Sequence, residues 1–284
     1  MTARQLGISR WSIAVSAVLV GVVSLAIGAH AALNKPALDT AMAIATERSG
    51  DTAKKPSRIA LVVGNGHYPD ADSPLTQPID DARGLTATLR RNGFDVDVVE
   101  DASKDDMRLA IGRLKSKIRP DSVVILFFGG YGIQVGHENY LIPVDAVIWK
   151  ESDVHREGLS IEAVLDVMKD QGVHARLVVI DASRRNPYER RFRTFSRGLA
   201  PINTPDNALI LTSAAPGKVA VDSQGPHSVL MAELLNNLNV QTASAETVFN
   251  KTSAAISRAS DNEQVPSVSS SLSTDVQLGP AADK

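Results

Sequence analysis

Short apolar runs alternate with amphipathic segments along most of this chain, and that alternation constrains the fold more than any other feature. Continuous runs rich in β-branched residues, typical of buried strands, cover 58–64 (RIALVVG), 122–128 (SVVILFF), 176–181 and 208–212. Alternating polar and apolar residues predict a further strand over 94–99. Apolar residues at helical spacing predict helices over 79–91, 105–118, 160–169, 228–238 and 245–259.

Strands that alternate with helices in this order predict one α/β domain, from about 58 to 279. Strands that are apolar on both faces indicate a mostly parallel central sheet with helices covering each side. The apolar positions Val265, Val268, Leu272 and Val276 favour a last strand at the edge of this sheet. Residues 280–284 are expected to form a loose C-terminal end.

The N-terminal residues, 1–33, differ from the rest of the chain. Arg4 and Arg10 precede an uncharged run from Trp11 to Leu33, long enough for the roughly 20-residue helix that crosses a bilayer. Ala29-His30-Ala31 also has the form that signal peptidase cleaves. A signal peptide and a membrane anchor both stay open, and either places the domain outside the cytoplasm, in the periplasm or at the membrane. Residues 34–57 are predicted to be a tether with a short helix around 41–47.

The composition excludes several classes of function. A net charge of −2 argues against nucleic-acid binding through bulk charge. The absence of cysteine excludes thiolate metal sites and any cysteine nucleophile. Gly64-Asn65-Gly66-His67 lacks the third glycine and the lysine of nucleotide-binding loops. The acidic residues between 95 and 106 are too loosely spaced for a calcium loop and predict a solvated face, so no metal or cofactor is expected.

Two predicted strands end in small residues that present one polar side chain each. The run to Phe128 continues as Gly129-Gly130-Tyr131-Gly132, and the run to Ile180 continues as Asp181-Ala182-Ser183. Parallel strands place their carboxyl ends at one edge of the sheet, where sites form, so Tyr131 and Ser183 are expected to be neighbours. Two ordinary turns are the alternative interpretation.

These segments resemble the caspase-like family of metacaspases and bacterial orthocaspases. The resemblance rests on FFGGYGIQV at 127–135, NYLIPVD at 139–145 and VVIDASR at 178–184. Tyr131 and Ser183 lie about 50 residues apart, as the catalytic His and Cys do in caspases. Shorter matches at 62–68, 78–82, 197–201, 215–222 and 266–272 extend it over nearly all of the domain. It implies a three-layer caspase-like sandwich.

The reacting groups of the family are both replaced in this chain. Tyr131 stands at the position of the catalytic His, and Ser183 stands at that of the Cys. A tyrosine is neutral at pH 7 and accepts protons poorly, and a serine without a base is a weak nucleophile. The resemblance therefore implies a pseudo-protease that binds or scaffolds. Two alternatives remain: a hydrolase in which Ser183 recruits His67, His137, His155, His174 or His227, and a structural envelope protein with a vestigial site.

The resemblance also implies a pocket for basic peptides, because Asp181 and Asp222 match positions that bind arginine or lysine in the family. Alternatively, Asp181 caps local backbone and Asp222 lies in a solvated turn. A hydrogen bond between Tyr131 and Ser183 would instead close the old site. A basic loop follows Ser183, and it is expected to be solvated. Alternatively, the loop contacts acidic partners or lipid headgroups, or it folds back so that an arginine fills the acidic pocket. Its arginines are Arg184, Arg185, Arg190, Arg191, Arg193 and Arg197.

Overall fold

The computed structural model describes residues 56–71, 74–169, 172–192, 197–220, 223–240 and 243–280. Residues 56–284 form one compact unit, and the fold below is that of this unit. The predicted leader and the tether up to residue 55 lie outside the described residues, as do Arg193, Asp222 and the end of the chain from residue 281. Every helix in the described part is too short or too polar to span a bilayer.

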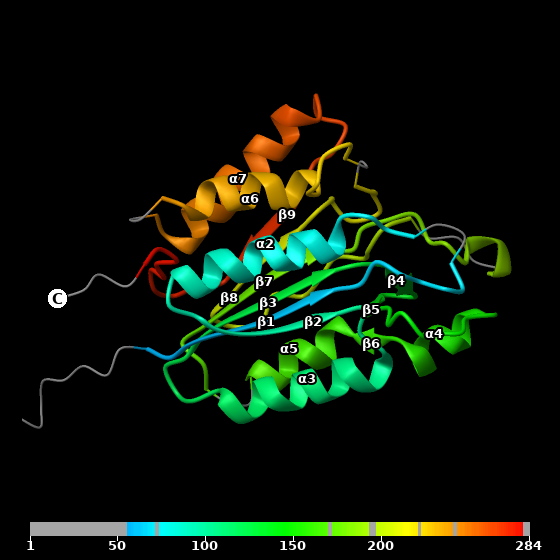
Figure 1. The fold of residues 1–284 in the computed structure, drawn as a ribbon, viewed down its shortest axis with the longest axis horizontal. Coiled ribbons are helices and arrows are strands. Elements are labelled where there is room, and N and C mark those ends of the chain that lie inside the picture. The colour runs from blue at the N-terminus through cyan, green and yellow to red at the C-terminus, as the bar shows by residue number, and fades with distance from the viewer. Residues whose placement is uncertain are drawn as a thin grey trace, which may run out of the picture. The chain divides into compact units, whose positions relative to one another are not determined.

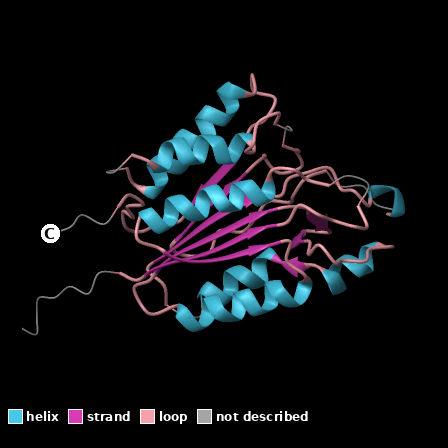
Figure 2. Ribbon diagram, in the orientation of Figure 1, coloured by secondary structure: helices cyan, strands magenta, loops and turns pink. Residues whose placement is uncertain are grey.

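A six-stranded sheet forms the centre of the unit, with strand order β2-β1-β3-β7-β8-β9 (Figure 2). Five neighbouring strands are parallel, and β9 closes one edge in the antiparallel direction. This confirms the predicted sheet. The strands are β1 (Arg58–Gly64), β2 (Asp95–Glu100), β3 (Val123–Gly129), β7 (Ala175–Asp181), β8 (Ala208–Thr212) and β9 (Ser267–Ser270).

Helices cover both faces of the sheet, as predicted. Figure 1 shows one layer on each side of the strands. The first layer contains α2 (Pro78–Arg91), α6 (Val229–Leu238) and α7 (Ala245–Ala259), and the second contains α3 (Lys104–Lys117) and α5 (Ile161–Lys169). The three-layer α/β class inferred from the sequence is therefore confirmed.

The alternation of side chains along the strands explains why the predicted runs are apolar throughout. In β1, Ala60 and Val62 pack with α2, α6 and α7, whereas Ile59, Leu61 and Val63 pack with α3 and α5. Successive side chains point to opposite faces, so a strand covered on both sides needs apolar residues at every position.

The sequence did not predict a small second sheet beyond the carboxyl end of β3. It consists of β4 (Gly132–Val135), β5 (Glu138–Leu141) and β6 (Leu159–Ser160). The helix α4 (Glu151–Glu157) lies between β5 and β6 in the chain. Its strands have four residues or fewer, too short for a recognisable pattern. Gly136, with φ of 63°, forms the tight turn between β4 and β5.

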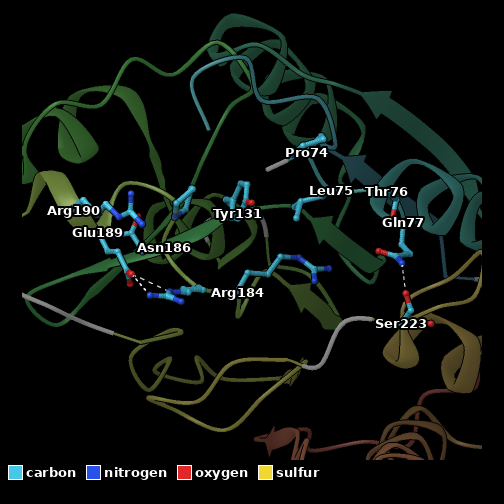
Figure 3. Close-up of a pocket in the computed structure, with 12 residues that line it drawn as sticks. Pro74, Leu75, Thr76, Gln77, Tyr131, Arg184, Asn186, Glu189, Arg190 and Ser223 are labelled. Atoms are coloured by element: carbon cyan, nitrogen blue, oxygen red, sulfur yellow. Dashed lines mark hydrogen bonds and ion pairs between the residues drawn. The ribbon is translucent and has the colours of Figure 1, made fainter. Parts of the chain in front are cut away.

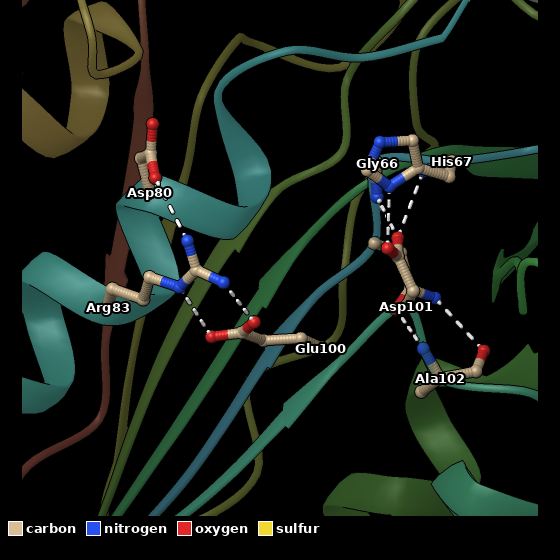
Figure 4. Close-up of polar contacts among 8 residues, drawn as sticks. Gly66, His67, Asp80, Arg83, Glu100, Asp101 and Ala102 are labelled. Carbon is tan, nitrogen blue, oxygen red and sulfur yellow. Dashed lines mark hydrogen bonds and ion pairs between the residues drawn. The ribbon is translucent and has the colours of Figure 1, made fainter.

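Most of the acidic face predicted to be solvated is paired with basic side chains. Lys117 contacts Asp95 at 2.9 Å, and Arg113 contacts Asp97 at 2.7 Å. Figure 4 shows Arg83 holding Glu100, with a shortest contact of 2.6 Å. These pairs line the exposed edge strand β2, and charged side chains on such an edge oppose pairing with another chain.

Glycine is required where β1 runs under α2. A Cβ on Gly64 would lie 2.3 Å from the carbonyl oxygen of Pro78, which is backbone and cannot move aside cheaply. We expect Gly64→Ala to lower the free energy of unfolding by about 1–3 kcal/mol in a urea titration. Gly112→Ala is the matched control, because its Cβ meets nothing within 4 Å and alanine favours a helix by about 0.5–1 kcal/mol. Equal effects of the two substitutions would contradict the prediction.

Candidate functional site

The register of the central sheet places the two predicted dyad positions at the same edge. Gly129 at the end of β3 pairs with Asp181 at the end of β7, and Tyr131 and Ser183 each follow two residues later. The two turns are joined directly, since Gly130 N donates to Asp181 O at 3.2 Å and Gly132 N donates to Ala182 O at 3.1 Å.

Ser183 is fully buried, and its hydroxyl contacts no activating group by a hydrogen bond among the described residues. Its Oγ atom makes no hydrogen bond within the part of the chain that the structure describes. The alternative in which Tyr131 and Ser183 hydrogen-bond to each other is therefore contradicted. Four of the five candidate bases bond elsewhere: His67 to Asp101, His155 to Tyr140, His174 to Thr274 and His227 to Asp81. Figure 4 shows the first of these pairs. The fifth candidate, His137, is exposed in the turn between β4 and β5.

Tyr131 is held by a second tyrosine rather than by the serine. Its ring meets that of Tyr68 edge to face, with 4.9 Å between ring centroids. The Tyr68 hydroxyl accepts from Tyr131 N at 3.0 Å and donates to Ile142 O at 3.0 Å. Burial raises the pKa of Tyr68 well above its ordinary value, so this hydroxyl stays protonated and keeps its role as a donor.

Four backbone N–H groups around the two positions are already bonded and are not available to stabilise an oxyanion. Acyl transfer needs N–H groups aimed at the oxygen that gains charge. Here Gly130 N, Tyr131 N and Gly132 N all donate within the fold, and Arg184 N donates to Ala182 O at 2.8 Å. These four N–H groups are therefore already bonded.

A cluster of buried carboxylates lies behind these turns. Asp181 is 1% exposed, and its Oδ2 atom lies 3.4 Å from Nη2 of Arg184. Asp81 of α2 is fully buried and accepts from His227 Nδ1 at 2.9 Å and from Ser228 N at 3.1 Å. Burial and the nearby charge of Asp181 raise the pKa of Asp81 to about 6. Asp181 is thus part of a buried ion pair with Arg184.

Sequence reasoning missed Asp81, although a signal was present. The residue lies on the same face of the helix as Ala82, Leu85 and Leu89, which is the face that packs on the sheet. A carboxylate on an apolar helix face is costly to bury without a partner, so its position predicts a buried polar partner.

An open cavity of about 500 Å³ lies in front of the cluster. Figure 3 shows Tyr131 and Arg184 at its centre, whereas Ser183 and Asp181 do not line it. Gln77 Nε2 donates to Ser223 O at 2.8 Å and links two rims. The lining residues are Pro74, Leu75, Thr76, Gln77, Tyr131, Arg184, Arg185, Asn186, Pro187, Glu189, Arg190 and Ser223.

The arginines after Ser183 do not form a uniformly solvated loop. Arg184 is buried against Asp181, and Arg185 Nε contacts Glu189 at 2.9 Å. Arg191 donates to Asp70 at 2.8 Å and lies over the ring of Trp149, 4.6 Å from its centroid. The contact of Arg191 with Asp70 therefore ties the loop to a distant segment, whereas the Arg185–Glu189 pair lies within the loop.

Comparison with known proteins identifies the family. The model of the family described as "Caspase domain" matches residues 57–277. The chain belongs to this family. Among solved structures, "structure of pro-sf-caspase-1" superposes with a TM-score of 0.59 at 16% sequence identity, covering 81% of this chain and 94% of that one. This likeness supports the caspase fold.

A curated relative of this caspase domain is "Mucosa-associated lymphoid tissue lymphoma translocation protein 1" of Homo sapiens. The two are 25% identical over 144 residues, which is 50% of this chain. The match spans only 17% of the human protein. The resemblance read from the sequence motifs is thus confirmed at the level of the family.

The described residues offer no site for a metal ion. Within residues 56–280, apart from the short gaps given above, no three His, Asp or Glu side chains converge in a way that could hold one.

Proposed function

We propose that this caspase-domain protein is a pseudo-protease that binds a peptide segment without cleaving it. The observation that carries the proposal is the state of Ser183, whose hydroxyl is buried and lacks a hydrogen-bond partner among the described residues. A serine nucleophile needs an adjacent base to take its proton. Tyr131 does not supply that base, since Ser183 Oγ bonds to no described side chain.

The cavity supports a binding function. Its volume of about 500 Å³ suits one or two side chains of a bound peptide. We propose that its ligand is a peptide bearing arginine or lysine, whose basic group reaches past the cavity wall formed by Arg184 to the carboxylate of Asp181, with Asp222 as the second carboxylate. A carboxylate forms strong charge-assisted hydrogen bonds with a guanidinium, often two in parallel.

We further propose that the domain lies outside the cytoplasm. This placement rests on the apolar run at 11–33 and the basic residues before it, which favour export or anchoring in the membrane. The domain would then meet its peptide partner in the periplasm or close to the membrane surface.

A cleavage assay tests the absence of proteolysis. The full-length protein, purified in detergent, is incubated with a library of peptides that contain arginine and lysine, beside a Ser183→Ala variant. We expect the two proteins to give the same product yield by mass spectrometry, because loss of a nucleophile or base lowers turnover by about 10⁴–10⁶. Cleavage that disappears in Ser183→Ala would establish a serine hydrolase instead.

Peptide binding distinguishes a functional site from a vestigial one. We expect a fluorescent arginine peptide to bind the full-length protein measurably, and to bind at least about tenfold more weakly after Asp181→Asn. Glu246→Gln, an exposed carboxylate at the start of α7, is the matched control and should leave binding unchanged. No difference between the two variants would favour a vestigial site.

A further inference from the structure

Arg184 places a guanidinium inside the acidic cluster. The residue follows Ser183 and turns back, so that its Nη2 atom lies 3.4 Å from Asp181 Oδ2. The two side chains are 8% and 2% exposed, so water screens this pair little. In Figure 3 the Arg184 side chain lines the cavity between Tyr131 and the Gln77–Ser223 bridge.

A second carboxylate favours a cation at this place. Asp81 comes from α2 and is close enough to Asp181 for their charges to interact. Two buried carboxylates oppose each other's ionisation, and a cation among them relieves that repulsion. His227 bonds to Asp81, while the side chain paired with Asp181 is that of Arg184.

We propose that Arg184 is an internal ligand that occupies the acidic pocket, so that a basic peptide binds only by displacing it. The proposal rests on the proposed binding function and concerns the same site. It names the residue that sets the site's affinity for arginine and lysine. The predicted self-occupation by the basic loop is thereby assigned to Arg184 rather than to Arg190 or Arg191.

The competition between internal and external guanidinium has a simple physical basis. Arg184 is tethered three residues from Asp181, so its effective concentration at the carboxylate exceeds that of a dissolved peptide. An external arginine can form charge-assisted hydrogen bonds with Asp181, but it first has to displace the Arg184 guanidinium from its ion pair with that carboxylate. The internal pair therefore weakens binding of basic ligands without affecting ligands that avoid the acidic cluster.

Removal of Arg184 should create a site for free guanidinium compounds. In the full-length Arg184→Ala protein, we expect methylguanidinium at millimolar concentration to raise the midpoint of thermal unfolding, at constant ionic strength set with potassium chloride. We also expect the fluorescent arginine peptide to bind at least about tenfold tighter than to the unaltered protein. The stabilisation of Arg184→Ala by methylguanidinium, called the rescue below, requires no catalysis, so it stays informative if the proposed function fails.

Two variants make the result specific. Arg185→Ala is the matched control, because its side chain is 78% exposed and contacts Glu189 instead of Asp181, and it should show neither effect. Arg184→Ala combined with Asp181→Asn should lose the rescue. Should Arg184→Ala not fold, Arg184→Gln gives the same titration with more of the side-chain volume retained.

The proposal is overturned if methylguanidinium stabilises Arg184→Ala and Arg184→Gln no more than it stabilises Arg185→Ala. It is also overturned if the rescue survives Asp181→Asn. Tighter peptide binding without any rescue would place the basic ligand elsewhere in the cavity and would equally contradict it. Rescue without binding of any peptide would support the internal ligand but not the proposed function.

Discussion

Replacement of Asn65 by alanine is expected to lower the free energy of unfolding by roughly 3–4 kcal/mol. Asn65 is fully buried where β1 ends. Its Oδ1 atom accepts from Ala102 N at 2.8 Å, and its Nδ2 atom donates to Ile142 O at 3.2 Å. Alanine would leave a buried N–H and a buried carbonyl without these partners, and each unpaired group costs about 1–3 kcal/mol.

The same substitution should loosen one wall of the cavity. Asn65 joins the ends of β1 and β2 to the segment after β5, and the loop that begins at Gly66 continues to the lining residues Leu75 and Gln77. Urea-induced unfolding measures the effect on stability. Asn250→Ala, at an exposed position of α7, should change stability by less than about 0.5 kcal/mol. A loss below 1 kcal/mol in Asn65→Ala would show that water or rearranged backbone replaces these bonds.

The second large effect is a pH dependence that originates from Asp81. Burial, and then the charge of Asp181, raise the pKa of Asp81 from 3.8 to about 6 in the folded protein. The folded state thus holds this proton more tightly than the unfolded state does. The stabilisation is complete below about pH 4 and is lost as the pH rises through about 6.

A shift of this size corresponds to about 3 kcal/mol, at 1.36 kcal/mol for each pKa unit. The Asp81→Asn variant cannot ionise at this position. We therefore expect the stability of the unaltered protein to fall relative to Asp81→Asn by up to about 3 kcal/mol between pH 4 and pH 7. Urea unfolding at several pH values measures this difference.

The neighbouring carboxylate provides the control for this measurement. Asp80 lies in the same turn of α2, but its side chain is 54% exposed and contacts Arg83 at 3.6 Å. Asp80→Asn should follow the unaltered protein across this pH range, because exposed pairs contribute little. A constant difference between Asp81→Asn and the unaltered protein at all pH values would refute the expected titration.

The candidate site divides clearly into what could and could not be predicted from the sequence. The positions of Tyr131 and Ser183 at one sheet edge were predictable, because parallel strands that end in glycine and small residues bring their termini together. The partners of those side chains were not predictable. Tyr131 packs on Tyr68, and Asp181 pairs with Arg184, through turns whose conformations no periodic pattern specifies.

Asp81 was also only partly predictable from the sequence. Its position on the buried face of α2 follows from helical spacing. Its proximity to Asp181 depends on how α2 lies across the sheet, and its bond to His227 joins segments almost 150 residues apart in the chain. Such long-range neighbours are set by packing, which a single sequence does not display.

By itself, the sequence determined the α/β class, the mostly parallel character of the central sheet and the absence of cysteine from the printed residues. These properties depend on local periodicity and on composition, and both follow directly from the printed residues. Only the tertiary structure decided that the Ser183 hydroxyl is buried without a hydrogen-bonded base in the described part of the chain, and that Arg184 pairs with Asp181. Those contacts depend on the register of β3 and β7 and on the turns that follow them. These bring together side chains that no local sequence pattern relates to one another.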